Sequence, residues 1–251
     1  MSAGNGQLSN IKLTLAYDGT DYNGWQIQPE GRTIQGELTR VLSLLDQRQV
    51  TVHGAGRTDA GVHAEGQVAS FRLERDFGLR ELRDAINGNL DRDIRIFEAE
   101  VVAESFHARV SARLKTYRYR IWTQDVVSPF VRRYVHHFRS PLDIETMGRA
   151  ANVLIGEHDF RAFTVSASEA ETSVRTIRRL EIVEESAGLA ILVSADGFLR
   201  YMVRAIAGTL IEVGRGRLSV TGVANALNTL DRAQAGPTAP ACGLTLLSVD
   251  Y

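Results

Sequence analysis

The sequence predicts an α+β protein made of two ferredoxin-like α/β subdomains, with antiparallel sheets flanking a central cleft. Residues 11–102 give strand and helix patterns in the order β-α-β-β-α-β, which is the ferredoxin-like signature. The second half of the chain repeats this theme more loosely. With 251 residues, 44% of them hydrophobic and 24% charged, the chain has an ordinary globular composition and suits one large domain or two small ones.

In the first half, the opening strand is the clearest element, because Ile11, Leu13, Leu15 and Tyr17 alternate with Lys12 and other polar or small residues. Thr33 is placed to cap the helix that follows. After this strand we expect a helix over 34–45, a strand over 49–53, an irregular glycine-rich segment over 54–66, a strand over 68–73, a helix over 79–90 and a strand over 94–102.

The second half is predicted on the same grounds. Phe198, Met202, Ile206 and Leu210 lie four apart, on one face of a helix. In order, we expect strands over 116–122 and 134–138, a helix over 144–154 capped by Asp143, a hairpin of 176–184 with 189–195, the helix that begins near Phe198, a helix over 220–230 and a strand over 244–251. These patterns predict a tail over residues 1–10, an N-terminal domain over 11–106 and a C-terminal domain over 107–251.

Composition and charge exclude several classes of protein. The single cysteine, Cys242, excludes a disulfide framework or a cysteine-based zinc site within one chain. No run of 18 apolar residues exists and the N-terminus lacks the apolar core of a signal peptide, so we expect a cytoplasmic protein without membrane segments. The net charge of −1, from 29 basic and 30 acidic residues, is not that of a wholly basic nucleic-acid binder. Any RNA site must therefore come from local clusters, in which arginine predominates.

The most informative segment is Gly54-Ala-Gly-Arg-Thr-Asp-Ala-Gly-Val-His-Ala64, for which three interpretations compete. A dinucleotide fingerprint fits Gly54-x-Gly56, but its third glycine position holds Asp59 and no helix pattern follows. A metal site could use His53, Asp59 and His63, but no His-x-x-x-His or cysteine pair supports it. The third interpretation is a solitary carboxylate that attacks a carbon centre beside an arginine, on a loop that glycines allow to fold tightly.

The whole string closely resembles the active-site motif of the TruA family of pseudouridine synthases, and the resemblance covers residues 11–251. One departure is Tyr201, where histidine is common in that family. The other strings that match motifs of the family are Tyr17-Asp-Gly-Thr20, Gly24-Trp-Gln-Ile-Gln28, Thr33-Ile-Gln-Gly-Glu-Leu38, Gly66-Gln-Val68, Ser105-Phe-His-Ala-Arg109, Lys115-Thr-Tyr-Arg-Tyr119, His158-Asp-Phe160, Gly197-Phe-Leu-Arg-Tyr-Met-Val-Arg204 and Ala241-Cys-Gly-Leu244.

The resemblance implies a function and a set of site residues. It implies conversion of uridine to pseudouridine at positions 38, 39 and 40 of the tRNA anticodon stem-loop, by a homodimer with a basic active-site cleft and without cofactor or metal. Asp59 would be the catalytic nucleophile, with Arg204 as its charged partner and Tyr117 stacked on the flipped uracil. The expected substrate-binding residues are Tyr117, Arg57, Thr58 and His63, while His53, His107 and Tyr201 receive no role.

The chemistry explains why a carboxylate and an arginine are needed together. Burial raises the pKa of a carboxyl group, whereas a neighbouring guanidinium opposes that shift and keeps the group ionised. Arg204 follows Arg200 by four residues, so we expect both on one helical face. Whether the carboxylate adds to C1′, adds to the uracil ring or removes a sugar proton stays open.

Phosphate contacts are expected from local clusters of basic residues rather than from the chain as a whole. Two alternatives compete with the synthase: a non-catalytic ferredoxin-like RNA-binding module, and a pseudouridine synthase that acts on another RNA. A pure binder needs no acid beside a phosphate-binding arginine, so Asp59 with Arg204 discriminates between the classes. The clusters are Arg109, Arg113, Lys115, Arg118 and Arg120; Arg132 and Arg133; and Arg175, Arg178 and Arg179.

Overall fold

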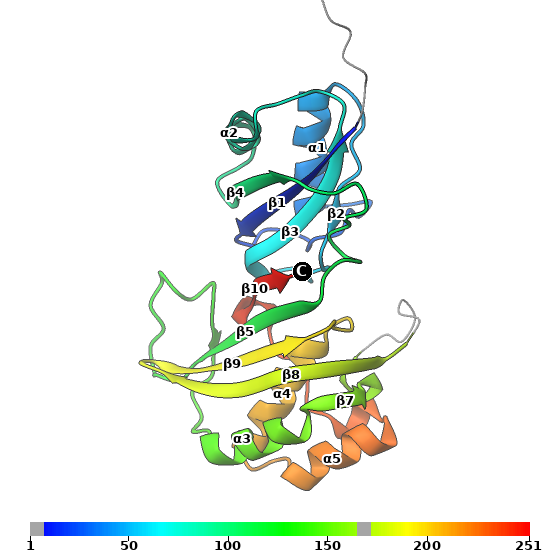
Figure 1. The fold of residues 1–251 in the computed structure, drawn as a ribbon. Helices are drawn as coiled ribbons and strands as arrows, with labels where there is room; N and C mark the ends of the chain where they lie inside the picture. The colour runs from blue at the N-terminus through cyan, green and yellow to red at the C-terminus, as the bar shows by residue number, and fades with distance from the viewer. Residues whose placement is uncertain (1–7, 165–171) are drawn as a thin grey trace, which may run out of the picture. The chain divides into compact units, whose positions relative to one another are not determined.

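The structure is a computed structural model, and it describes residues 8–164 and 172–251. The chain divides into two compact units: unit 1 is the chain up to Ala112 together with Tyr251, and unit 2 is Arg113–Asp250 (Figure 1). The expected N-terminal tail lies mostly outside the described residues, but Ser9 and Asn10 already belong to the first strand. None of the helices within the described ranges is both long and apolar enough to cross a membrane.

Unit 1 has the predicted order β-α-β-β-α-β. Its elements are β1 (Ser9–Tyr17), α1 (Ile34–Asp46), β2 (His53–Gly54), β3 (His63–Leu73), α2 (Leu79–Asn89) and β4 (Ile94–Val101). The strands lie in the order β4-β1-β3-β2 and every neighbouring pair is antiparallel. Alternate residues of β1, among them Leu13 and Leu15, are fully buried, as are Leu38 and Leu42 of α1. The α1 helix begins where the sequence predicts, because the Thr33 hydroxyl accepts a hydrogen bond from the Gly36 amide.

Two expectations for unit 1 are wrong. Residues 49–52 form no strand, because side chains of α1 satisfy their backbone: Ser43 Oγ accepts from the Val50 amide and Gln35 donates to the Val52 carbonyl. The segment 54–66 is also not irregular to its end. β3 begins at His63, and Ala64 already pairs with Tyr17 of β1.

Unit 2 contains a further set of antiparallel strands with helices packed on them. Its elements are β5 (Leu114–Trp122), β6 (His136–His137), α3 (Ile144–Val153), β7 (Gly156–Asp159), β8 (Val174–Glu185), β9 (Gly188–Ala195), α4 (Met202–Gly214), α5 (Val220–Thr229) and β10 (Leu244–Asp250). The strands lie in the order β10-β5-β9-β8-β7, all antiparallel, and β6 adds a short parallel pairing with β5.

The two units share one topology. In unit 2 the elements β5, α3, β8, β9, α4 and β10 repeat the β-α-β-β-α-β order, and their strands lie as β10-β5-β9-β8. This matches the β4-β1-β3-β2 order of unit 1 strand for strand. The predicted fold class, two ferredoxin-like α+β subdomains with antiparallel sheets, is therefore confirmed.

Two expectations for unit 2 are wrong. Only His136–His137 of the segment 134–138 forms a strand. The helix expected from Phe198 begins at Met202 instead, because Tyr201 has a left-handed backbone (φ 61°, ψ 1°) that a right-handed helix cannot include. Phe198 and Arg200 therefore lie in the turn between β9 and α4.

Candidate active site

Asp59 lies on the loop of residues 55–62 that joins β2 to β3, here called the Asp59 loop. Backbone hydrogen bonds from the preceding part of unit 1 fix it. The Trp25 amide donates to the Thr58 carbonyl (3.0 Å), and the Gly61 amide donates to the Tyr22 carbonyl (3.3 Å). The Asp59 carbonyl itself accepts from the Val62 amide (3.1 Å), which closes a tight turn around the carboxylate-bearing residue.

Gly24 lets the segment before α1 approach the Asp59 loop closely. Its φ is +85°, a conformation that favours glycine. A Cβ at this position would lie 2.6 Å from the Thr58 carbonyl oxygen and 3.0 Å from the Asp59 carbonyl carbon. The Gly24-Trp-Gln-Ile-Gln28 string and the Asp59 string are thus parts of one packed structure.

A buried polar network lies beneath the loop. The Tyr17 hydroxyl shares a hydrogen bond with Thr58 Oγ1 (2.9 Å) and accepts one from Gln67 Nε2 (3.3 Å). Gln67 Nε2 also donates to the Gly56 carbonyl (2.9 Å). Burial raises the pKa of Tyr17 to about 12, so its hydroxyl keeps its proton at neutral pH and stays available to the network.

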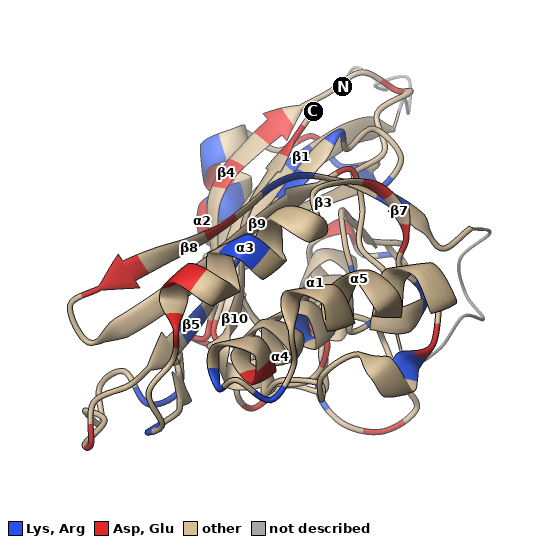
Figure 2. Cartoon of the chain, turned by 90° about the horizontal axis from the view of Figure 1, so that it is seen from below, with Lys and Arg blue, Asp and Glu red and all other residues tan. Residues whose placement is uncertain are grey.

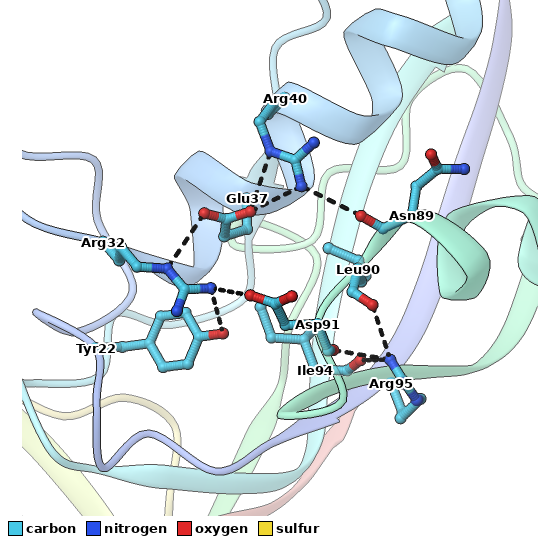
Figure 3. Close-up of polar contacts among 9 residues, drawn as sticks. All are labelled: Tyr22, Arg32, Glu37, Arg40, Asn89, Leu90, Asp91, Ile94 and Arg95. Atoms are coloured by element: carbon cyan, nitrogen blue, oxygen red, sulfur yellow. Dashed lines mark hydrogen bonds and ion pairs between the residues drawn. The ribbon is translucent and has the colours of Figure 1, made fainter.

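A second brace connects the loop before α1 to the turn after α2 (Figure 3). The Arg32 guanidinium lies 4.9 Å from the centre of the Tyr22 ring, donates to the Tyr22 hydroxyl (3.2 Å), and pairs with Asp91 and with Glu37. Arg40 pairs with Glu37 in turn and donates to the carbonyl of Asn89, the last residue of α2. Since the Tyr22 carbonyl accepts from Gly61, this brace also supports the Asp59 loop.

The predicted site residues of unit 1 differ in exposure. The Arg57 side chain is exposed and Asp59 is half-buried, whereas Thr58 and His63 are 7% and 3% exposed. His63 Nδ1 accepts a hydrogen bond from the Gly19 amide (3.1 Å) and lies 3.2 Å from Asp18 Oδ1. These contacts connect β3 to the loop after β1.

Tyr117 and Arg204 belong to unit 2. Tyr117 is buried on β5, and the Phe198 ring meets its ring edge-on at 5.1 Å. Arg204 lies in the first turn of α4, where its Nε donates to the Ala239 carbonyl (2.8 Å). The neighbouring Tyr119 is fully buried and donates to the Pro240 carbonyl, so it is a core residue. The choice of Tyr117 over Tyr119 as the substrate-facing residue stays a prediction.

The expectation that Arg200 and Arg204 share a helical face is wrong, because Arg200 precedes α4. Both guanidinium groups nevertheless lie beside one ring, that of Tyr201, at 5.1 and 5.0 Å from its centre. The local sequence offers no signal for this arrangement. It depends on the left-handed backbone of Tyr201, which a helical pattern does not reveal.

Two histidines and the single cysteine lie outside the proposed catalytic set. The His53 and His107 rings lie 4.6 Å apart, and burial together with the His107 ring lowers the pKa of His53. Burial raises the pKa of the Cys242 thiol, whose Sγ donates to the Val135 carbonyl, which fits an inert cysteine. In residues 8–164 and 172–251, no three His, Cys, Asp or Glu side chains are grouped to hold a metal ion.

The basic clusters are partly neutralised by acids. Arg120 pairs with Glu185 (2.8 Å) and Arg179 pairs with Glu181 (2.6 Å). Figure 2 shows acidic residues among the basic ones along β8, whereas α4 and α5 are almost free of colour. Arg132 and Arg133, in the loop before β6, are exposed.

Comparison with known proteins identifies relatives along nearly the whole chain. A family described as tRNA pseudouridine synthase matches residues 14–110 and 150–251. A tRNA pseudouridine synthase A from Citrifermentans bemidjiense is 46% identical over 97% of this chain and 98% of its own length. One from Moorella thermoacetica is 45% identical over 96% and 99%. A solved Cbf5-Nop10-Gar1 complex matches 94% of this chain and 57% of that one at 14% identity, with a TM-score of only 0.34.

Proposed function

The chain belongs to the tRNA pseudouridine synthase A family, and on this premise we propose that Asp59 is its catalytic nucleophile. The enzyme is an isomerase that converts uridine in tRNA to pseudouridine. This activity decides against the two alternatives drawn from the sequence, a non-catalytic binding module and a synthase for another RNA. The dinucleotide interpretation also fails, because the strand β3, and not a helix, follows the glycine-rich loop.

The reaction needs only a group that handles the sugar while the base turns. The C1′–N1 bond of uridine breaks, the uracil rotates, and a C1′–C5 bond forms. The hydrogen on C5 leaves as a proton and N1 gains one, so substrate and product have the same composition. A carboxylate can trap the electron-poor centre during this exchange, as carboxylates do in glycosidases.

The braced Asp59 loop is the observation that carries the proposal. A carboxylate that must attack one carbon atom has to be held in place before the substrate arrives. Hydrogen bonds reach the loop at Thr58, Gly61 and Gly56. The Gly61 amide donates to the carbonyl of Tyr22, the residue that Arg32 contacts in Figure 3. A surface ion pair or a simple turn would not require this support.

The roles that we propose for the other site residues follow from the family resemblance. We assign to Arg204 the guanidinium that keeps Asp59 ionised, and to Tyr117 the ring that stacks on the flipped uracil. Arg57, which is exposed, contacts the RNA directly. Thr58 and His63, both buried, contribute to substrate binding by shaping the loop.

We further propose that the substrate is the anticodon stem-loop of tRNA, at positions 38, 39 and 40. Three synthetic stem-loops, each with uridine at only one of these positions, test this directly. Carbodiimide derivatisation followed by primer extension would detect pseudouridine at the single site in each. Modification at all three positions is expected. Modification of full-length tRNA only outside these positions would contradict the proposed site.

We propose that the enzyme is a homodimer in which both subunits hold one tRNA. Because its net charge is −1, the chain as a whole attracts RNA only weakly. In a dimer, the local basic clusters of both subunits would combine on one tRNA. A tRNA substrate also implies a cytoplasmic enzyme. Light scattering at working concentration should give twice the 27.7 kDa chain mass, and a monomeric mass for a fully active sample would refute the dimer.

A further inference from the structure

Tyr201 has a backbone conformation that its surroundings must enforce. Its φ is 61° and it stands immediately before α4. In the described residues, the other non-glycine residues with positive φ are Gln47 and Leu230, and both follow the end of a helix, where the left-handed conformation is common. Tyr201 stands at the start of a helix, where the left-handed conformation is not common. For a non-glycine residue this conformation costs about 1 kcal/mol or more. Such strain is concentrated at functional sites.

The Tyr201 ring contacts two cations. The guanidinium carbon of Arg204 lies 5.0 Å from the ring centre and that of Arg200 lies 5.1 Å from it. Arg200 also reaches the Tyr201 hydroxyl, at 3.5 Å. A cation within about 6 Å of a tyrosine ring is attracted by the negative face of the ring. Both arginines are therefore restrained by one side chain.

The place of Arg204 in the helix is unfavourable for a cation. It lies in the first turn of α4, where the helix dipole presents positive charge, and that turn contains no acidic residue. Arg200 adds a second positive charge nearby. The hydrogen bond from Arg204 Nε to the Ala239 carbonyl (2.8 Å) and the contact with the Tyr201 ring are among the interactions that offset this repulsion.

The main chain of Arg204 is also fixed. The Ala239 amide donates to the Arg204 carbonyl (3.0 Å), and the Ala205 amide donates to the Tyr201 carbonyl (2.9 Å). On the other side, Thr164 Oγ1 donates to the Arg200 carbonyl (2.9 Å). With the backbone held at these points, the contact with the Tyr201 ring restrains the end of the long Arg204 side chain.

We propose that Tyr201 is a positioning residue, which holds the Arg204 guanidinium at the orientation that pseudouridine formation requires. This rests on the proposed role of Arg204. In this proposal Tyr201 acts through Arg204 and has no assigned contact with the substrate.

Two substitutions distinguish the effect of the Tyr201 ring from the effect of its backbone conformation. Tyr201→Phe keeps the ring and loses the hydroxyl, whereas Tyr201→Asn loses the ring but tolerates the left-handed conformation. In single-turnover reactions with saturating enzyme, we expect Tyr201→Phe to stay within about 3-fold of the wild-type rate and Tyr201→Asn to be slower by about 10- to 100-fold, as for a misplaced catalytic group. The dissociation constant for tRNA should change by less than about 3-fold. The reason is that Tyr201→Asn weakens an interaction made in the transition state and leaves the binding of the ground-state tRNA intact.

Phe138→Asn is the matched control. The Phe138 ring lies 5.3 Å from the Arg215 guanidinium, so this variant removes a similar cation–π contact from unit 2 at a place with no proposed catalytic role. We expect it to keep the wild-type rate at a temperature at which circular dichroism shows every variant folded. A Tyr201→Asn variant as fast as this control, or a Tyr201→Phe variant as slow as Tyr201→Asn, would overturn the inference.

A double-mutant cycle with Arg204→Gln shows whether Tyr201 acts through Arg204. If it does, the double variant should be no slower than Arg204→Gln alone, because the ring then has no guanidinium to hold. The inference would be refuted if the rate loss of the double variant equalled the product of the losses of the two single variants. An Arg204→Gln variant with the wild-type rate would refute the role of Arg204 itself, whereas a slow Arg204→Gln with a fast Tyr201→Asn would refute the inference about Tyr201 alone.

Discussion

At the scale of single residues, Tyr17 shows how a remote side chain supports the candidate nucleophile. Its ring is 4% exposed, 6.2 Å from the Trp25 ring, and its hydroxyl connects Thr58 with Gln67. The Asp59 loop therefore rests on a tyrosine from β1, a strand that carries no proposed catalytic residue. Removing the hydroxyl leaves its two buried partners with fewer hydrogen bonds, which costs about 1 to 3 kcal/mol.

Tyr17 also predicts a loss of stability in alkali. Burial raises its pKa from 10.0 to about 12, so the folded state holds the proton more tightly than the unfolded state does. The resulting stability is complete below pH 10 and is lost as the pH rises towards 12, by roughly 2 to 3 kcal/mol. Urea unfolding at pH 8 and pH 11.5 measures the total loss, to which Tyr119 and Tyr251 also contribute because burial raises their pKa values too. The part that belongs to Tyr17 is the difference between wild type and a variant without its hydroxyl.

In the Tyr17→Phe variant we expect lower stability than wild type at pH 8, with a gap that narrows or reverses at pH 11.5. The more exposed Tyr134 provides the control, and Tyr134→Phe should follow the wild type at both pH values. Equal losses of stability in wild type and Tyr17→Phe between the two pH values would contradict this account of Tyr17.

At the scale of elements, α4 packs closely against the segment of residues 236–240, and this packing positions Arg204. A Cβ at Gly208 of α4 would overlap the Pro237 carbonyl oxygen and lie 3.3 Å from the Ala239 amide nitrogen. The Ala239 carbonyl accepts the hydrogen bond from Arg204 Nε. A displacement of this segment therefore removes a contact that positions the guanidinium.

We expect Gly208→Ala to destabilise the protein by about 1 to 3 kcal/mol and to slow pseudouridine formation. Gly148→Ala in α3 is the matched control, because a Cβ there meets no atom within 4 Å. Alanine in this helix interior should stabilise by about 0.5 to 1 kcal/mol and leave the rate unchanged. Thermal unfolding and single-turnover assays compare the two, and a Gly208→Ala variant as stable and active as wild type would refute the account.

The elements that follow from sequence are those fixed by local interactions. The caps Thr33 and Asp143 begin α1 and α3 as expected, because a cap is formed by residues two or three apart. Residues 49–52 could not be predicted, since Ser43 and Gln35 satisfy their backbone from a preceding helix. The left-handed Tyr201 could not be predicted either.

In the candidate site, too, local features could be predicted from the sequence and contacts with distant segments could not. The string around Asp59 singles out the carboxylate, but its supports come from elsewhere in unit 1. Tyr17 lies in a string that matches a family motif, which is the only sequence signal for its role. Nothing in the local pattern indicates that Gly24 packs on the backbone of Thr58 and Asp59. Such long-range contacts require the structure.

At the scale of the whole molecule, tRNA binding must come from basic side chains whose charge is not already paired. Each phosphate contact releases counterions, so the affinity should fall steeply as salt is added. Arg132 is exposed in the loop before β6, whereas Arg179 has a carboxylate partner, Glu181, at 2.6 Å. These two arginines therefore predict different salt dependences.

We expect Arg132→Gln to reduce the slope of log affinity against log salt by about one, and Arg179→Gln to leave the slope almost unchanged. Filter binding of tRNA between about 50 and 200 mM salt measures both slopes. A wild-type affinity that does not depend on salt would count against a basic cleft, and equal slopes for the two variants would contradict the assignment of Arg132 to the RNA surface.

Tritium release from tRNA labelled at uracil C5 tests the central claim most directly, because formation of the C1′–C5 bond must expel the C5 hydrogen. We predict release by the wild-type protein and a loss of at least about 10³-fold in Asp59→Ala, with tRNA binding and the folded state retained. Release by Asp59→Ala at the wild-type rate would contradict the assignment of Asp59 as the nucleophile.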